Sequence, residues 1–228
     1  MQRTYKFIIF SLLLLVGVFS ATAQVKTAPK DTVFTPLFNG IRLDVDISPV
    51  FKKLLSGNET YSYEAAVLVN LKRKYFPVIE MGYAGVDKTT ENLVGFKTNG
   101  IFGRVGIDFN LMKSKNNKKT ENNLFFVGGR LGFANFKYDL TNVVITDDYW
   151  NESQTMNYIN ESASKMWFEI VAGIRVEIAK NIFMGWTARN KNLIGEDPIG
   201  TMSPWYIPGF GKTTGSAWTL NYVVGYKF

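Results

Sequence analysis

The chain has 228 residues, of which 46% are hydrophobic and 20% charged, and its net charge is +7. This composition is too apolar for a disordered chain and too polar for a bundle of membrane helices. Cysteine and histidine are both absent, which excludes disulfide scaffolds, thiolate metal sites and Ser-His triads. We therefore expect no enzyme, no bound metal and no other cofactor, although catalysis by carboxylates alone, such as Asp44 with Asp46, stays open.

The first 23 residues have the three-part layout of a secretory signal peptide. Arg3 and Lys6 precede an apolar run over residues 7–19, and Ala21-Thr22-Ala23 then supplies the small residues of a cleavage site. A transmembrane anchor is the alternative, but the run is shorter than the roughly 20 residues that a spanning helix needs. The predicted organisation is a signal peptide, a polar periplasmic leader and an outer-membrane β-barrel, over residues 1–23, 24–38 and 39–228.

From residue 39 onward, apolar residues alternate with polar residues or glycine. In the clearest segment, Met166–Ile178, Ile174 and Val176 alternate with Arg175 and Glu177. The charges of this segment would scatter around a helix, whereas on a strand they lie on one side. Eight such segments predict eight strands, over residues 41–47, 61–72, 75–85, 101–111, 125–134, 166–178, 182–189 and 218–228.

The connections between these segments are alternately short and long. Short turns are predicted at Arg73-Lys74 and Lys180-Asn181, and a longer but wholly polar turn at 113–123. The longest links are Asp139–Lys165 and Lys191–Gly215. Short turns at one end and long loops at the other describe a meander. The predicted fold class is all-β, an eight-stranded antiparallel up-and-down transmembrane β-barrel.

Two features predict that the apolar face of the strands lies outside the barrel. Aromatic rings concentrate at the ends of the apolar face, as at a bilayer interface. The polar face carries glycines, which make room for long side chains inside a narrow barrel; these are Gly82, Gly106, Gly128, Gly132, Gly173, Gly185 and Gly225. The alternative is a secreted soluble barrel that binds an apolar ligand, as lipocalins do.

The inward faces carry seven cations and seven anions, so the predicted lumen is neutral. Unpaired buried charges cost several kcal/mol, and the arginine fork bonds carboxylates bidentately. Glu169 with Arg130 and Arg175, and Glu80 with Arg104, are candidate members of this network, and the sequence leaves the pairing among them open. The resulting plug closes the bore; a narrow conduit for small polar solutes is the alternative. The predicted network comprises Arg42, Asp44, Asp46, Glu64, Glu80, Arg104, Asp108, Arg130, Glu169, Arg175, Glu177 and Arg189.

The two longest loops carry aromatic residues that could stack on a ligand, because functional residues concentrate in loops on a rigid scaffold. A structural or surface-binding role is predicted for them, with a surface glycan or a protein as partner. The alternative is that the aromatics fold back and cap the barrel mouth. Nucleic acid is not an expected partner, since the lysine-rich stretch 113–119 has no interleaved aromatics. The candidates are Tyr149, Trp150, Trp205, Tyr206 and Phe210.

The last predicted strand ends in Tyr226-Lys227-Phe228, which resembles the terminal aromatic signature that barrel-insertion machinery recognises in outer-membrane barrels. The resemblance implies that Tyr226 and Phe228 form an insertion signal and that this machinery is a partner during biogenesis. It also implies outer-membrane lipid around the barrel and the cell outer membrane as the location.

Four further segments resemble a family of uncharacterised bacteroidete outer-membrane β-barrel proteins of unknown function. They are Gly40–Asp46, Trp167–Glu177, Asn181–Gly185 and Trp205–Phe210. The resemblance covers nearly all of the predicted mature chain and implies a fold and a location, but no activity. At a broader level the layout is similar to small eight-stranded barrels such as OmpX, OmpW and the OmpA membrane domain.

Overall fold

The computed structural model describes the chain over residues 36–51, 60–112, 122–147, 152–195, 203–213 and 215–228. The predicted signal peptide and nearly all of the predicted leader lie outside the described residues, so both stay predictions. None of the described helices is long and apolar enough to cross a membrane.

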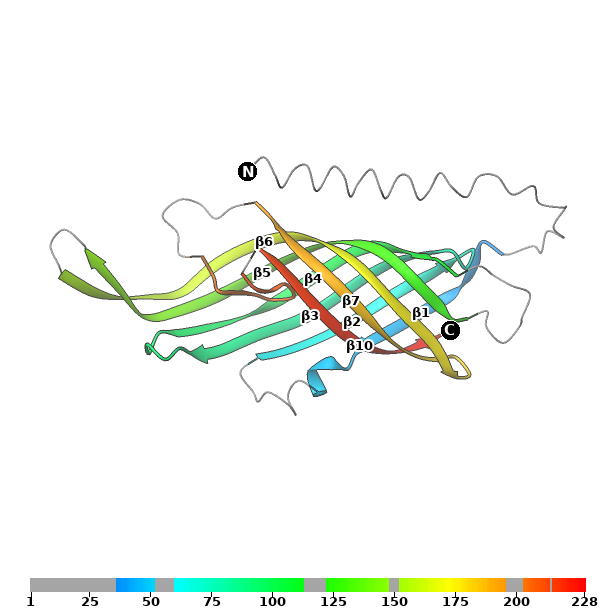
Figure 1. Ribbon diagram of the computed structural model, residues 1–228, viewed down its shortest axis with the longest axis horizontal. Helices are drawn as coiled ribbons and strands as arrows, with labels where there is room; N and C mark the ends of the chain where they lie inside the picture. Colours follow the sequence, from blue (N-terminus) through cyan, green and yellow to red (C-terminus); the bar gives the residue numbers. More distant parts are fainter. Residues whose placement is uncertain (1–35, 52–59, 113–121, 148–151, 196–202, 214) are drawn as a thin grey trace, which may run out of the picture. The chain divides into compact units, whose positions relative to one another are not determined.

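Eight strands form a closed antiparallel barrel in which neighbours in the sequence are neighbours in the ring, and the last strand pairs with the first (Figure 1). This confirms the predicted fold class. Each predicted strand corresponds to one observed strand. The barrel strands are β1 Phe38–Asp46, β2 Thr60–Leu71, β3 Tyr75–Thr89, β4 Gly95–Asn110, β5 Leu124–Asp147, β6 Glu152–Ala179, β7 Ile182–Ile194 and β10 Ser216–Lys227.

The turns predicted after β2 and β6 lie at one end of the barrel, which we call the turn end; the opposite end is the loop end. In the β2–β3 turn, Lys72 and Arg73 have φ angles of 52° and 54°. Positive φ at both central residues gives the backbone twist that suits a two-residue hairpin. The Asn70 side chain holds the turn by accepting a 3.0 Å hydrogen bond from the Arg73 backbone N–H.

The prediction of a long loop over Asp139–Lys165 is wrong. Here β5 and β6 continue as strands of 24 and 28 residues, and their hairpin extends beyond the other strands (Figure 1). Apolar alternation was a poor guide to this hairpin, because its apolar residues are irregularly spaced among polar ones. Register shifts interrupt the hairpin, and at one of them Asn160 (φ 60°) donates its backbone N–H to Asp139 Oδ1 at 2.7 Å.

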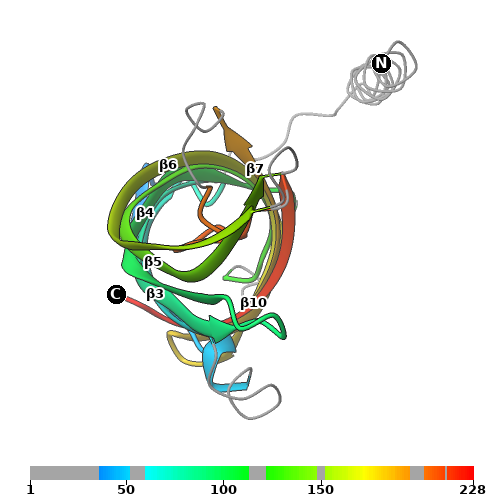
Figure 2. The same cartoon turned by 90° about the vertical axis from the view of Figure 1, so that its left-hand side faces the viewer.

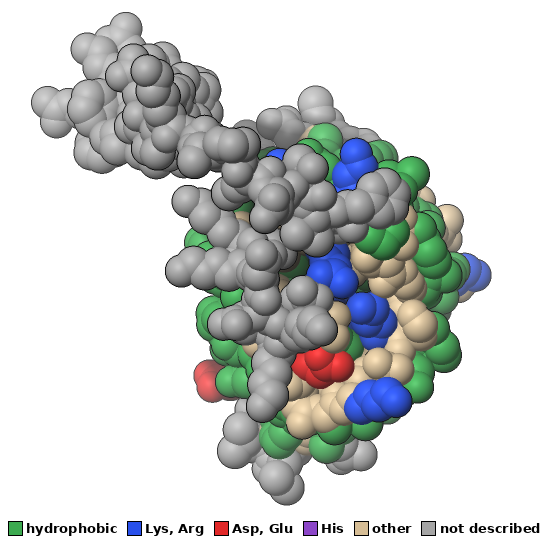
Figure 3. All heavy atoms as spheres, turned by 90° about the vertical axis from the view of Figure 1, so that its right-hand side faces the viewer, with side chains coloured by type: hydrophobic (Ala, Val, Ile, Leu, Met, Phe, Trp, Pro, Cys, Tyr) green, Lys and Arg blue, Asp and Glu red, His purple; other side chains and the backbone are tan. Residues whose placement is uncertain are grey.

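Side-chain exposure confirms the predicted orientation of the strands. On β6, Ile170 is 55% exposed whereas its neighbour Glu169 is 1% exposed. Each of the eight barrel strands carries outward apolar side chains that are exposed. Viewed from the turn end, hydrophobic side chains follow the outline of the barrel, and acidic and basic side chains lie within it (Figure 3).

The seven inward glycines make room for large inward side chains, as predicted. A Cβ atom added at Gly82 would overlap the ring of Phe102, and one added at Gly132 would overlap Trp167. The other five would overlap backbone carbonyls or the side chains of inward arginine, aspartate and phenylalanine residues. Since such overlaps require the neighbours to shift, these positions fix how the interior is packed.

The interior is not polar throughout, which the sequence analysis did not predict. An apolar cluster on the loop side includes Phe102, Phe136 and Trp167. A second apolar cluster on the turn side includes Phe76 and Phe126. Buried charged side chains occupy the interior between and beside these clusters.

Candidate functional site

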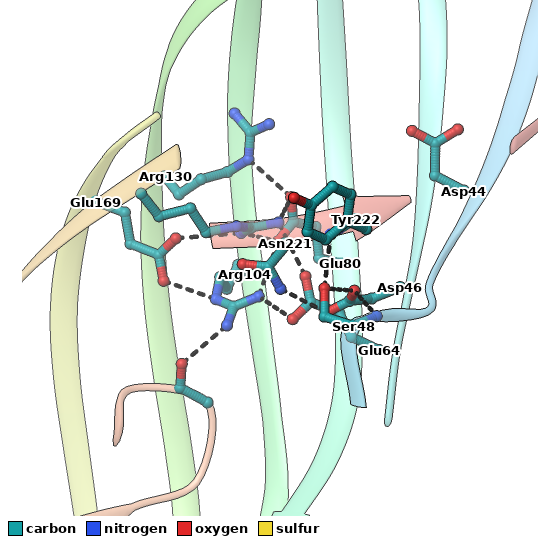
Figure 4. A network of polar contacts seen from close by, with 12 residues as sticks. Asp44, Asp46, Ser48, Glu64, Glu80, Arg104, Arg130, Glu169, Asn221 and Tyr222 are labelled. Atoms are coloured by element: carbon teal, nitrogen blue, oxygen red, sulfur yellow. Dashed lines mark hydrogen bonds and ion pairs between the residues drawn. The ribbon is translucent and has the colours of Figure 1, made fainter. Parts of the chain in front are cut away.

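The centre of the barrel holds a compact set of ion pairs, which we call the charged layer (Figure 4). Strands β2, β3 and β6 each supply one glutamate, and strands β4, β5 and β7 each supply one arginine. All six side chains are almost completely buried. The charged layer consists of Glu64, Glu80, Glu169, Arg104, Arg130 and Arg189.

Glu80 joins the three arginines of the charged layer. Its carboxylate accepts hydrogen bonds from Arg189 Nη1 at 2.7 Å, Arg104 Nη1 at 2.9 Å and Arg130 Nε at 3.1 Å. Glu80 and Arg104, both predicted members of the lumen network, are therefore paired. Hydrogen bonds to charged groups are the stronger class in proteins, so Glu80 couples three strands across the lumen.

Glu169, also a predicted member of the lumen network, pairs with two arginines. Its carboxylate lies 2.7 Å from Arg104 and 3.2 Å from Arg189, although Arg130 is its register partner on β5. The indole N–H of Trp167 also donates to Glu169 at 2.7 Å. Partner choice depends on strand register and barrel tilt, which bring β4 and β7 side chains to the β6 carboxylate.

A second group of ion pairs lies nearer the turn end. Asp44 Oδ1 accepts from Arg42 Nε at 2.8 Å, and Asp44 Oδ2 accepts from Arg175 Nε at 3.2 Å. Asp108 pairs with Arg130 at 2.8 Å, and through Arg130 it connects to the charged layer. The carboxylate pair suggested by Asp44 and Asp46 is thus already engaged at Asp44.

Two predicted network members lie apart from the arginines. Asp46 is half-buried and accepts hydrogen bonds from Ser48 and Asn221. Glu177 lies half-buried at the turn end and accepts from the Asn122 amide and the backbone N–H of Asn181. Neither forms an ion pair with another described residue within 4 Å, so both take part in the lumen contacts through hydrogen bonds alone.

The ammonium group of Lys191 is a buried charge that was not predicted from the sequence. Lys191 was assigned to a loop, but β7 continues to Ile194 and directs Lys191 inward, where it is 5% exposed. The buried charged side chains among the described residues therefore comprise six cations and five anions, not an equal number. They are Arg42, Arg104, Arg130, Arg175, Arg189 and Lys191 with Asp44, Glu64, Glu80, Asp108 and Glu169.

A small hairpin closes the loop end of the barrel from inside. It consists of β8 (Tyr206–Ile207) and β9 (Gly211–Lys212), and it lies within the ring when the barrel is viewed along its axis (Figure 2). Arg104 Nη2 and Lys191 Nζ both donate to the carbonyl oxygen of Gly209 in its turn, at 2.9 and 2.7 Å. The inward cations thus hold the hairpin by its backbone.

The three binding candidates predicted in this segment, Trp205, Tyr206 and Phe210, differ in how far they are exposed. Phe210 is fully buried and packs edge-on against Trp167 at 6.0 Å, so the expectation that it binds a ligand at the surface is corrected. Trp205 is 44% exposed and stacks on Phe96 at the barrel mouth. Tyr206 is half-buried, and burial raises the pKa of its phenol, which keeps it a neutral donor.

A cavity of about 250 Å³ lies between this hairpin and the wall formed by β1, β2 and β10. Deeper in the barrel, two voids of about 20 Å³ each have room for about one water molecule. Within the described ranges, no group of three or more acidic side chains is arranged to hold a metal ion. Of these three spaces, the cavity at the loop end has room for a ligand larger than water.

The remaining predicted site residues lie elsewhere. Tyr149 and Trp150 fall outside the described residues. Tyr226 and Phe228 pack edge-on at 4.9 Å and are exposed at the turn end. The backbone N–H of Phe228 donates to the Ile41 carbonyl at 2.9 Å, so this segment takes part in closing the barrel.

Comparisons with known proteins give a family without an activity. A family model described as a domain of unknown function (DUF6048) matches residues 4–228. No curated protein matches the sequence. Among solved structures, Ail, the attachment invasion locus protein of Yersinia pestis in complex with the heparin analogue sucrose octasulfate, is similar at 11% identity and a TM-score of 0.40. That similarity covers 83% of this chain and 94% of Ail, and at this level it carries no argument about function.

Proposed function

We propose that this chain, which belongs to the DUF6048 family of unknown function, is a closed barrel of the outer membrane that offers its loop end for binding. The observation that carries the proposal is a continuous outward apolar belt around an interior sealed by ion pairs. A bacteroidete origin and the signal peptide stay predictions.

The apolar belt has the dimensions of a bilayer. On β6 it runs from Met166 to Ile178, thirteen residues with no charged side chain on the outward face. At about 3.3 Å per residue and a tilt of about 40°, it spans roughly 33 Å, close to a hydrocarbon core of about 30 Å. A soluble barrel would leave this whole belt in water, far more than the few hundred Å² of a usual exposed patch.

The interior favours a plug over a conduit. The charged layer crosses the lumen from six of the eight strands, and the hairpin closes the loop end above it. The deeper voids have room for about one water molecule each. Opening a path would break buried ion pairs that cost about 3–5 kcal/mol when one partner is lost.

The loop end supports a binding role. The β5–β6 hairpin extends beyond the barrel, Trp205 is exposed at the mouth, and the cavity is lined in part by the β8–β9 hairpin. We infer a surface glycan or protein partner there, and outer-membrane lipid around the belt. Catalysis is not part of the proposal, because Asp44 is engaged by two arginines.

Cell fractionation and planar bilayers test this function together. After expression in a Gram-negative host, the protein should sediment with outer membranes and leave them only in detergent. The purified barrel should insert into planar bilayers without reproducible single-channel steps. Recovery in the soluble fraction would contradict the membrane assignment, and stepwise conductance would contradict closure and favour a conduit.

A further inference from the structure

The cavity at the loop end is lined by polar side chains whose hydrogen-bonding groups are not all satisfied by other described residues. Its walls come from β1, β2, β7, β10 and the β8–β9 hairpin. At about 250 Å³, it has the volume of roughly eight water molecules at about 30 Å³ each. This is room for a small polar molecule, not for a lipid chain or a folded partner.

One wall of the cavity presents a buried cation with no carboxylate partner. Lys191 donates to the carbonyl oxygens of Gly209 and Phe210, at 2.7 and 3.3 Å. Among the described residues, no carboxylate lies within 4 Å of its ammonium group. An ammonium group has three donors, so a third N–H is left for a ligand.

Another wall presents acceptors. Asp46 has no cation within 4 Å among the described residues, and its carboxylate is held by Ser48 and Asn221. The amide oxygen of Asn221 is buried and accepts no hydrogen bond in the described part of the chain. The buried hydroxyl of Thr219 has no partner there either. Buried polar atoms in proteins are nearly always hydrogen-bonded.

We propose that this cavity binds a small zwitterion, an amino acid or a short peptide. The carboxylate of the ligand bonds to Lys191, and its ammonium group bonds to Asp46 and the free amide oxygen of Asn221. A zwitterion supplies both missing charges at once, whereas a simple anion or cation would leave one wall uncompensated.

The other charges that line the cavity do not compete for this ligand. Arg104 and Glu64 pair with each other at 2.8 Å and belong to the charged layer. Lys212 is exposed on the hairpin, where it adds attraction for the carboxylate end. The inference rests on the proposed function in one respect, namely that the loop end is the accessible end of the barrel.

Titration calorimetry on the full mature chain in detergent micelles tests the proposal. The probes are glycine, diglycine and triglycine, which share the two charges and differ in the distance between them. Acetate and methylamine, each with one charge, are the control ligands. At least one zwitterion should bind at least about tenfold more tightly than either control ligand, since the control loses a charge-assisted hydrogen bond.

Two variants locate the binding site. Lys191→Gln and Asp46→Asn should each weaken binding of that zwitterion about tenfold or more. Lys97→Gln, the same substitution at a side chain that is 58% exposed, should leave it unchanged. If Lys191→Gln does not fold, the Asp46→Asn variant alone tests the site, because this variant keeps Lys191, which holds the hairpin.

Three outcomes would overturn the proposal: no zwitterion binds, single-charge ligands bind as tightly, or folded cavity variants bind as the wild type does. Because calorimetry in micelles does not depend on membrane location or conductance, its failure is distinguishable from a failure of the proposed function.

Discussion

Glu80→Gln tests whether the charged layer stabilises the barrel. The substitution keeps the shape of the side chain but removes the charge that three arginines share, at 2.7, 2.9 and 3.1 Å. One glutamine oxygen can still accept, but the new NH₂ group faces arginine donors. The buried charges, six cations and five anions in the native chain, become six and four.

Removing one partner of a buried ion pair costs about 3–5 kcal/mol, because the other charge stays buried without compensation. We expect Glu80→Gln to lower the free energy of unfolding by that amount. Asp87→Asn is the matched control, since it removes a carboxylate from the Lys97–Asp87 pair, whose side chains are 58% and 69% exposed. An exposed pair contributes about 0–1 kcal/mol.

Urea unfolding of both variants, followed by tryptophan fluorescence in lipid vesicles, measures the difference. The expected gap between Glu80→Gln and Asp87→Asn is about 3 kcal/mol. Equal stabilities within about 1 kcal/mol would show that the charged layer contributes no more than a surface ion pair. The buried ion pairs would then not be what holds the lumen closed.

The same unfolding assay checks three further predictions. Gly209→Ala places a Cβ at φ +80° against an inward phenylalanine ring and should cost about 1–3 kcal/mol more than Gly195→Ala, where φ is +85° and the space is open. Met81→Arg, on the belt at 68% exposed, should cost about 2–4 kcal/mol in vesicles, whereas Leu93→Arg, 71% exposed in the β3–β4 link, should be near neutral. Asp139→Ala removes the acceptor of a backbone N–H in the extended hairpin and should speed limited proteolysis there with little change in barrel stability.

Much of the barrel is determined by local pattern. Alternation with period two places Ile170 and Glu169 on opposite faces whatever the rest of the chain does, so strand number and orientation were predictable. The inward glycines were predictable for the same reason. The extended β5–β6 hairpin was not, because its strands pair with each other through register shifts and its few buried apolar side chains, such as Leu140, do not recur with period two.

Alternation in the sequence predicted which residues of the eight segments face the lumen, and that arginines and carboxylates meet there. The three-dimensional fold set the partners, since register and strand tilt bring Arg104 and Arg189 to Glu169. It also decided that Lys191 points inward and that Phe210 lies under the mouth. Contacts between residues far apart in the sequence depend on how the sheet closes, and no local pattern encodes that closure.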